Sequence, residues 1–183
     1  MLHDGRFLKK ALMIACPVAL QGMLNTIVNM VDTLMIGGLG STAIAAVGLA
    51  NKVFFVFSLL VFGIVSGGGI LAAQFWGSGD VKNIRKVLGL CVMLAMVGAL
   101  FFVIPAIASP KMVMRIFTTS EGSIELGAKY LRIAALCYPF IALTNVYVAM
   151  LRASNKVVFP VICSCIAIAI NICLNYVLIF GKF

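Results

Sequence analysis

The sequence predicts an all-α polytopic membrane protein. Hydrophobic residues make up 63% of the 183-residue chain and charged residues only 10%, and the mean hydropathy is +1.18. A soluble domain carries about 25% charged residues. The apolar residues form stretches that can cross a bilayer, which takes about 20 helical residues. Because these stretches are too long for strands and lack a two-residue alternation, we expect helices.

The first two helices are expected at residues 10–36 and 43–77. The first follows Lys9-Lys10 and ends at the polar, glycine-rich segment 37–41. Its length exceeds the 7–15 residues typical of a signal-peptide core, so we interpret it as a retained span. The second contains Lys52 and ends at Gly77-Ser78-Gly79-Asp80, a turn sequence.

The other three helices are expected at residues 84–108, 124–151 and 157–181. A polar segment precedes the fourth, and Arg152-Ala153-Ser154-Asn155-Lys156 separates it from the fifth. Pro160 suits the first turn of the fifth helix. Pro17 and Pro139 fall inside the first and fourth helices, where they should produce kinks.

One polar row follows the first helix. Gln21, Asn25, Asn29 and Asp32 are spaced by four, four and three residues, so they share one helix face. An aspartate at a helix centre costs about 2.5 to 3.5 kcal/mol in the bilayer, and such a carboxylate normally faces a bundle interior or a wet cavity. The row indicates a transport pathway, with Asp32 as the site of a coupling ion or proton. An ion pair with Lys52 or Arg132 is the structural alternative.

The fifth helix repeats this pattern. Ser164, Asn171 and Asn175 are spaced by seven and four residues and share a face. Amide oxygens there can coordinate a dehydrated cation, or they can simply join helices by hydrogen bonds. For Asn175, cation coordination and helix joining both stay open. For Asn171, we favour the functional role. The Gly67-Gly68-Gly69 run of the second helix indicates close helix packing, because it lacks the sequence context of a phosphate-binding loop.

Several classes of function are not supported. His3 is the only histidine, and the six cysteines lie in apolar segments, so neither a metal centre nor a histidine-based catalytic set is expected. The net charge of +9 comes from scattered basic residues without an aromatic-interleaved patch, which disfavours nucleic acid as a partner. We therefore expect no enzyme activity and no cofactor, with membrane lipid as the surroundings.

Orientation follows from the basic residues. With a cytoplasmic N-terminus, the cytoplasmic segments hold a mild excess of Lys and Arg, including the tight group Lys82, Arg85 and Lys86. Trp76, just before that group, fits an interfacial anchor. We expect a multi-pass protein of the plasma (inner) membrane.

At these residues the chain resembles the N-terminal lobe of the multidrug and toxic compound extrusion (MATE) family, and its last segment resembles the NorM-like branch most. The similar segments occur in the family's order: Pro17 and Val31-Asp32-Thr33-x-Met35-Ile36-Gly37-x-Leu39-Gly40; Ala45-Ala46-Val47-Gly48-Leu49-Ala50; Ala73-Gln74-x-x-Gly77; Tyr130-Leu131-x-Ile133; Leu151-Arg152-Ala153; Asn171-Ile172-x-Leu174-Asn175-Tyr176 and Phe180-Gly181-Lys182-Phe183.

The resemblance implies one six-helix lobe of a twelve-helix transporter, in which cation binding or protonation drives drug efflux. It implies a polar ion site at Asp32, Asn25, Tyr130 and Asn171. Several relatives have an aspartate where this chain has Asn175, so a two-carboxylate site is a point of departure. Asn155 and Val157 also replace the Gly and Thr usual in the loop after the fourth helix.

Residues 1–183 are thus expected to be a partial N-terminal lobe with five of its six helices and without the second lobe. Either the chain is a fragment of a longer reading frame or it is a truncated product that does not transport alone. The expected function is an antiporter that exports cationic amphipathic drugs in exchange for Na⁺ or H⁺. Gln21, Asn29 and Ser164 would line the substrate cavity.

Two alternatives remain open. A lipid-precursor flippase of the same superfamily would favour a cavity with several arginines, and only Arg132 lies near a span. A non-transporting membrane assembly subunit would tolerate replacement of Asp32.

Overall fold

The computed structural model describes residues 15–16, 19–28, 30 and 41–180, with the backbone alone for residues 175–180. Every regular element within these residues is helical, which confirms the all-α prediction. The chain separates into two compact units. Unit 1 comprises Met1–Met35 and Asn155–Phe183, and unit 2 comprises Ile36–Ser154.

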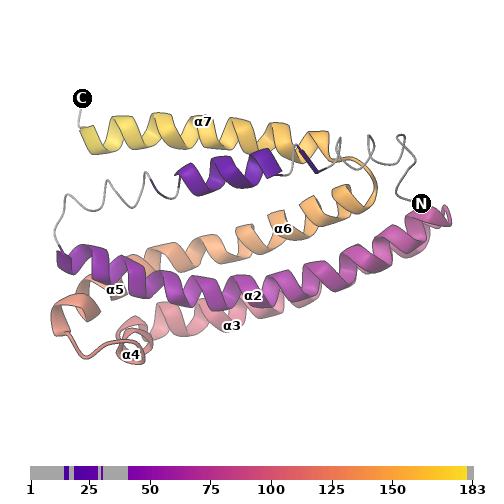
Figure 1. The fold of residues 1–183 in the computed structure, drawn as a ribbon. Coiled ribbons are helices and arrows are strands. Elements are labelled where there is room, and N and C mark those ends of the chain that lie inside the picture. Colours follow the sequence, from indigo (N-terminus) through magenta and orange to yellow (C-terminus); the bar gives the residue numbers. More distant parts are fainter. Residues whose placement is uncertain (1–14, 17–18, 29, 31–40, 181–183) are drawn as a thin grey trace, which may run out of the picture. The chain divides into compact units, whose positions relative to one another are not determined.

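Unit 2 is a helical bundle in which three long helical segments lie side by side (Figure 1). Its elements are α2 (Ser41–Gly77), α3 (Val81–Ala108), α4 (Pro110–Arg115), α5 (Glu121–Ala134), the 3₁₀ turn η1 (Ala135–Cys137) and α6 (Tyr138–Ala153). In unit 1, the helical residues between 15 and 30 run alongside α7 (Val158–Phe180) in the same direction (Figure 1).

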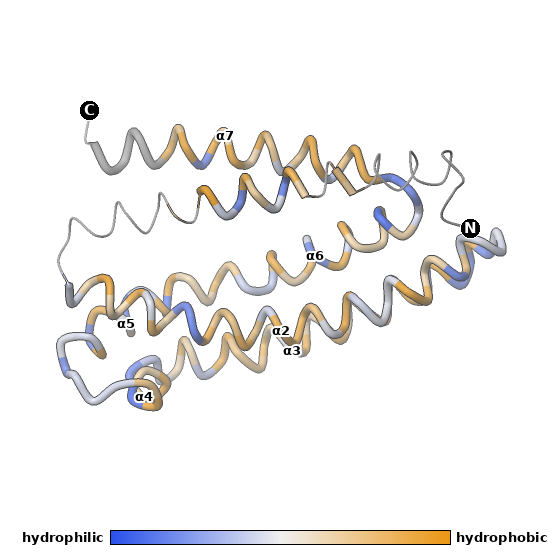
Figure 2. The backbone as a smooth tube through the Cα atoms, in the orientation of Figure 1, coloured by the Kyte–Doolittle hydropathy of each residue, from blue (hydrophilic) through white to orange (hydrophobic). Residues whose placement is uncertain are grey.

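Three helical segments of the described chain are long and apolar enough to cross a membrane: Ser41–Gly77, Val81–Ala108 and Glu121–Ala153. They are mostly hydrophobic along their length (Figure 2). The expected first span, 10–36, lies partly outside the described residues, and α7 is apolar over Val158–Leu174. The protein is therefore a multi-pass membrane protein.

The described spans begin two or three residues before the expected positions 43, 84 and 124. At α3 and α5 the difference has a physical cause, because the residues before the expected positions include the charged Lys82 and Glu121. A helix continues into the interface, where charged residues of its first turn are solvated. At α3, Asp80 caps the helix, so that it begins at Val81 and includes Lys82.

Pro139 interrupts the fourth span, as the sequence predicts. A proline has no N–H, so Pro139 cannot donate to the carbonyl of Ala135 four residues earlier. The Tyr138 N–H donates to the Ala135 carbonyl instead, and the chain forms η1 between α5 and α6. Pro17 lies outside the described residues.

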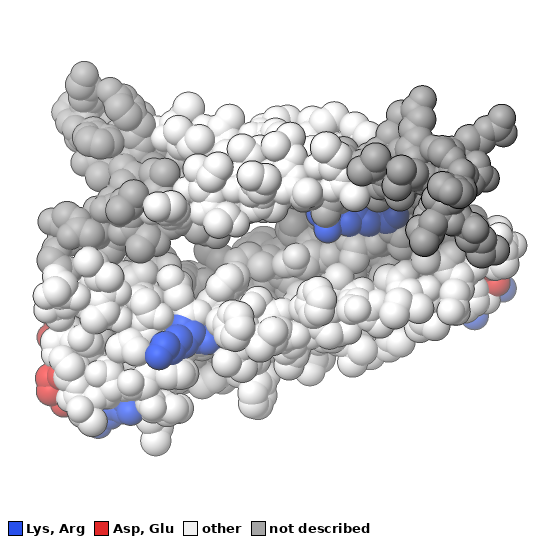
Figure 3. All heavy atoms as spheres, in the orientation of Figure 1, with Lys and Arg blue, Asp and Glu red and all other residues white. Residues whose placement is uncertain are grey.

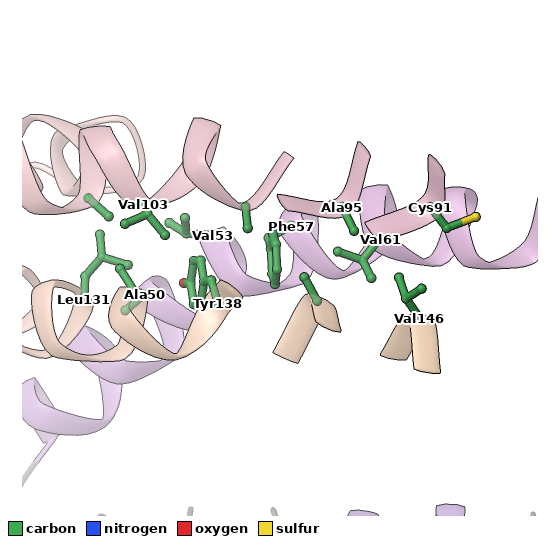
Figure 4. Packing of buried hydrophobic residues seen from close by; sticks show 14 of the residues in the cluster. Ala50, Val53, Phe57, Val61, Cys91, Ala95, Val103, Leu131, Tyr138 and Val146 are labelled. Carbon is green, nitrogen blue, oxygen red and sulfur yellow. The ribbon is translucent and has the colours of Figure 1, made fainter. Parts of the chain in front are cut away.

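The core of unit 2 is built around two stacked rings. Phe57 on α2 is fully buried, and its ring stacks on Tyr138 of α6 with centroids 4.7 Å apart and an interplanar angle of 9°. Phe102 of α3 meets Phe57 edge-on at 5.7 Å. Figure 4 shows Phe57 and Tyr138 in the middle of this cluster, between the labelled residues of α2, α3 and α6.

Small residues let the helices approach on either side of this aromatic cluster. The fully or almost fully buried positions include Ala46, Ala50, Ala95, Ala99 and Ala142. In a bilayer, lipid tails are as apolar as leucine, so close packing of small residues drives helix association. The large aliphatic side chains are mostly at exposed positions, which in a membrane protein face lipid.

One of the three consecutive glycines in α2 has a packing role in unit 2. A Cβ at Gly68 would overlap the Sγ atom of Cys91 on α3 and lie 3.2 Å from Cε of Met150. At Gly67 and Gly69, no described atom lies within 4 Å of such a Cβ. The expectation of close packing therefore holds at Gly68, and the helix period leaves its two neighbours on other faces.

Candidate functional site

One residue of each polar row predicted from the sequence contacts the other in unit 1. Nε2 of Gln21 donates a hydrogen bond to Oγ of Ser164 on α7, although 143 residues separate them in sequence. Gln21 is only 8% exposed, while the apolar Leu20 and Met23 beside it are more than half exposed. Gln21 therefore turns toward α7, while Leu20 and Met23 turn outward.

Asn25 lies one helical turn after Gln21 on the same row and is exposed. Thr26 beside it is satisfied within its own helix, because its Oγ1 donates to the carbonyl of Gly22 at 3.0 Å. The amide of Asn25 is therefore the next polar group along the face that Gln21 begins.

On α7, Asn171 lies two turns after Ser164 and is also exposed. Asn175 is one turn further, within the helical backbone of α7, and its side chain is outside the described part. Asp32 and Asn29, the other two members of the first row, lie outside the described residues as well. The predicted ion site around Asp32 therefore stays a prediction.

Tyr130 belongs to unit 2, where it lies on α5 and is 39% exposed. The other residues of the predicted site belong to unit 1. Of the predicted set, the structure thus joins Gln21 with Ser164 directly, while the place of Tyr130 beside them stays a prediction.

Unit 2 contains a polar feature that the sequence analysis did not single out. Ser58 of α2 and Asn145 of α6 line a groove of about 330 Å³, together with Phe62 and three aliphatic residues of α2. Ser58 Oγ donates to the carbonyl of Phe55 at 2.7 Å, and Asn145 Nδ2 donates to the carbonyl of Ile141 at 2.9 Å. Each polar residue interrupts a long apolar run, which is the sequence signal that could have found it.

The chemistry available in unit 1 is that of neutral oxygen ligands. Glutamine, asparagine and serine offer carbonyl and hydroxyl oxygens, which suit hard cations and hydrogen-bond donors. Among the described residues, no group of three or more His, Cys, Asp or Glu side chains could hold a metal ion.

Comparisons with known proteins agree with these features. The sequence profile described as MatE matches residues 17–177. A protein named "Probable multidrug resistance protein NorM" from Bradyrhizobium diazoefficiens is 33% identical over 95% of this chain. "Probable multidrug resistance protein YoeA" from Bacillus subtilis is 30% identical over 91% of the chain, and a NorM protein of Thermotoga maritima, also named as probable, is 29% identical over 96%.

A solved structure shares the fold. It is described as a MOP superfamily transporter from Pyrococcus furiosus, and it matches 94% of this chain with a TM-score of 0.85 and 22% identity. The chain spans 38% of that structure and 37%, 36% and 38% of the three relatives, in the order given above. Since the family profile covers nearly the whole chain, the protein belongs to the multidrug and toxic compound extrusion (MATE) family of membrane transporters.

Proposed function

We propose that the chain forms the ion-binding part of a lobe in an antiporter that exports cationic amphipathic drugs in exchange for Na⁺ or H⁺. Asp32 binds the coupling ion, with Asn25, Tyr130, Asn171 and Asn175 around it. Gln21, Asn29 and Ser164 line the adjoining substrate cavity. Transport needs a second lobe, against which this lobe rocks to give alternating access.

The bond from Gln21 to Ser164 carries this proposal, because it fixes the register of two parallel helices. Asp32 comes eleven residues after Gln21, and Asn175 comes eleven residues after Ser164. Eleven residues make about three helical turns, or roughly 16 Å along the axis. We infer that the helix expected at residues 10–36 continues this pairing to positions 32 and 175, which would give the carboxylate an amide partner.

Such a site supports ion coupling for an electrostatic reason. An unpaired carboxylate within a span is costly, so the site is most stable when a proton or Na⁺ neutralises it. The amide and hydroxyl oxygens of the two rows supply the other ligands of a cation but no counter-charge. A cationic drug and the coupling ion then compete for the same negative charge, and this competition is what an antiporter requires.

The available energy is sufficient for drug efflux. Moving one charge through a potential of 100 mV supplies about 2.3 kcal/mol, which corresponds to roughly fiftyfold accumulation. The proposed location is the plasma (inner) membrane with the N-terminus in the cytoplasm. This orientation places the start of α3, with Lys82, Arg85 and Lys86, on the cytoplasmic side, in agreement with the positive-inside rule.

Ion binding by the purified chain in lipid nanodiscs tests the proposal. Isothermal titration calorimetry with Na⁺, and with protons in buffers of different ionisation heat, should detect a site in the unmodified chain that is lost in Asp32→Asn. The fluorescent cation ethidium should be displaced by the same ion, and this displacement should also disappear in Asp32→Asn.

Asp80→Asn is the matched control, since it removes one carboxylate outside the proposed site and asparagine still caps a helix well. It should leave ion binding unchanged. Equal ion binding by the unmodified chain and Asp32→Asn would refute the role of Asp32.

A further inference from the structure

The turn between α2 and α3 has a well-defined geometry. At the end of α2, the Gly79 N–H donates to the carbonyl of Trp76 at 3.2 Å, and the Asp80 N–H donates to the carbonyl of Phe75 at 2.9 Å. Gly79 has a φ of 75°. This pair of bonds with a left-handed glycine is a Schellman motif, which ends a helix sharply.

The same turn starts α3 without a gap. Oδ1 of Asp80 accepts a hydrogen bond from the backbone N–H of Asn83 at 3.1 Å, and Oδ2 accepts one from Nδ2 of Asn83 at 2.6 Å. Asp80 is therefore the N-cap of α3, and its carboxylate is engaged by Asn83. The residues on either side of the turn are held close together by these bonds.

Three exposed cations follow at once: Lys82, Arg85 and Lys86, here called the α3 basic cluster. Arg85 and Lys86 come three and four residues after Lys82, which places all three on one face of α3. Positive charges at a helix N-terminus oppose the helix dipole, so local helix stability does not explain them. No ion pair involves them within the described part of the chain.

The opposite end of unit 2 has a different charge balance. There the acidic residues of α5 pair with bases: Arg115 with Glu121 at 3.7 Å, and Lys129 with Glu125 at 3.1 Å. Red atoms appear at both ends of the long helices in Figure 3. At the α3 end, however, the acidic residue Asp80 is used by the cap and leaves the basic cluster without a counter-ion among the described residues.

The face of α3 that begins with the cluster continues as an apolar surface. Met93 lies two turns after Lys86, and Leu100 and Ile104 lie five turns after Lys82 and Lys86, so these three residues share the direction of the cluster. All three are exposed, with Ile104 at 62%. Trp76, the only tryptophan of the chain, is 41% exposed just before the turn, and tryptophan favours the headgroup level of a bilayer.

We propose that the α3 basic cluster binds the headgroups of anionic phospholipids, whose acyl chains lie along the apolar face of α3. The combination is specific for a lipid, because phosphate-binding cations, an interfacial tryptophan and a lipid-facing stripe follow one another along one helix hairpin. A nucleic acid or an acidic peptide would have no use for the apolar part. This inference does not depend on the transport proposal.

Trp76 provides a direct assay. The chain is reconstituted in phosphatidylcholine bilayers that contain a minor fraction of phosphatidylglycerol, and bromine atoms, which quench tryptophan, are placed on the chains of one lipid or of the other. The quenching gives the relative affinity of the two lipids around Trp76. Since one basic residue near an anionic surface contributes about fivefold, phosphatidylglycerol should be favoured by about fivefold or more.

The variants separate the cluster from general charge attraction. K82Q/R85Q/K86Q should lose the preference, whereas K82R/R85K/K86R should keep it. K111Q/R115Q/K129Q, which removes the same charge at the other end of unit 2, should also keep it. Helical content by circular dichroism shows that each variant is folded, and R85Q alone replaces the triple variant if the latter does not fold.

Two further measurements need no variant. Higher ionic strength should weaken the preference of the unmodified chain, and inorganic phosphate at constant ionic strength should have no additional effect, because the site takes a lipid and not a free phosphate. Equal quenching by the two brominated lipids, or equal losses in the α3 and control triple variants, would overturn the proposal.

Discussion

Replacement of Phe57 by alanine tests the view that tight packing holds unit 2 together in the membrane. Phe57 is fully buried between α2, α3 and α6, and it contacts the rings of Tyr138 and Phe102. In a soluble protein such a change costs about 3 to 5 kcal/mol, of which a large part is transfer from water. In a bilayer that part is small, because the separated helices leave Phe57 in lipid.

The remaining loss in the free energy of unfolding of Phe57→Ala can be estimated from packing alone. Removal of the ring leaves a cavity on the order of 100 Å³, which at about 24 cal/mol per Å³ corresponds to roughly 2.4 kcal/mol. Loss of the stacked contact with Tyr138 adds about 0.5 to 1.5 kcal/mol. Phe57→Ala should therefore lower the free energy of unfolding by about 3 to 4 kcal/mol.

The assay is reversible unfolding of the chain in bicelles, followed by near-ultraviolet circular dichroism. Phe55→Ala is the matched control, because Phe55 lies two residues away on the same helix and is 61% exposed. It should change the free energy of unfolding by less than about 0.5 kcal/mol. Equal effects of the two substitutions would show that packing around Phe57 does not stabilise the bundle.

Two other experiments test contacts, one in each unit. Gly68→Val should destabilise the protein by about 1 to 3 kcal/mol, because its side chain would overlap Cys91, whereas Gly69→Val should stay within about 0.5 kcal/mol because no described atom is near; equal unfolding curves for the two variants would contradict the packing at Gly68. A double-mutant cycle of Gln21→Ala and Ser164→Ala should give a coupling energy of about 0.6 kcal/mol, measured by the same unfolding assay, and a coupling of zero would show that the hydrogen bond does not form.

Much of unit 1 could be predicted from helical periodicity. The spacing of Gln21 and Asn25, and of Ser164 and Asn171, places each pair on one face, and the structure joins one residue of each pair through the hydrogen bond of Gln21 to Ser164. Helical periodicity did not predict the register at which the first helix and α7 pair. That depends on how two helices pack, which involves atoms 143 residues apart in the chain.

In unit 2 the sequence predicted where a helix is interrupted better than it predicted which helices contact one another. A proline cannot donate a backbone hydrogen bond, so Pro139 had to disturb its helix, and η1 lies directly before it. The helix α4 was not predicted, because six residues carry too little periodic signal. The groove beside Ser58 and Asn145 was also missed, since it exists only where α2 and α6 pack together.

The sequence by itself determined that the chain is helical and crosses a membrane, since composition and the length of apolar runs decide how a backbone can satisfy its hydrogen bonds in lipid. It also determined which residues share a helix face. Only the tertiary structure decided that Gly68 and not Gly69 contacts Cys91, and that Phe57 stacks on Tyr138. It also decided that Arg115 and Lys129 pair with glutamates of α5, whereas the basic residues of α3 have no such pair among the described residues. The physical reason is that periodicity fixes directions around one helix, whereas contacts depend on the rotation and register of its neighbours.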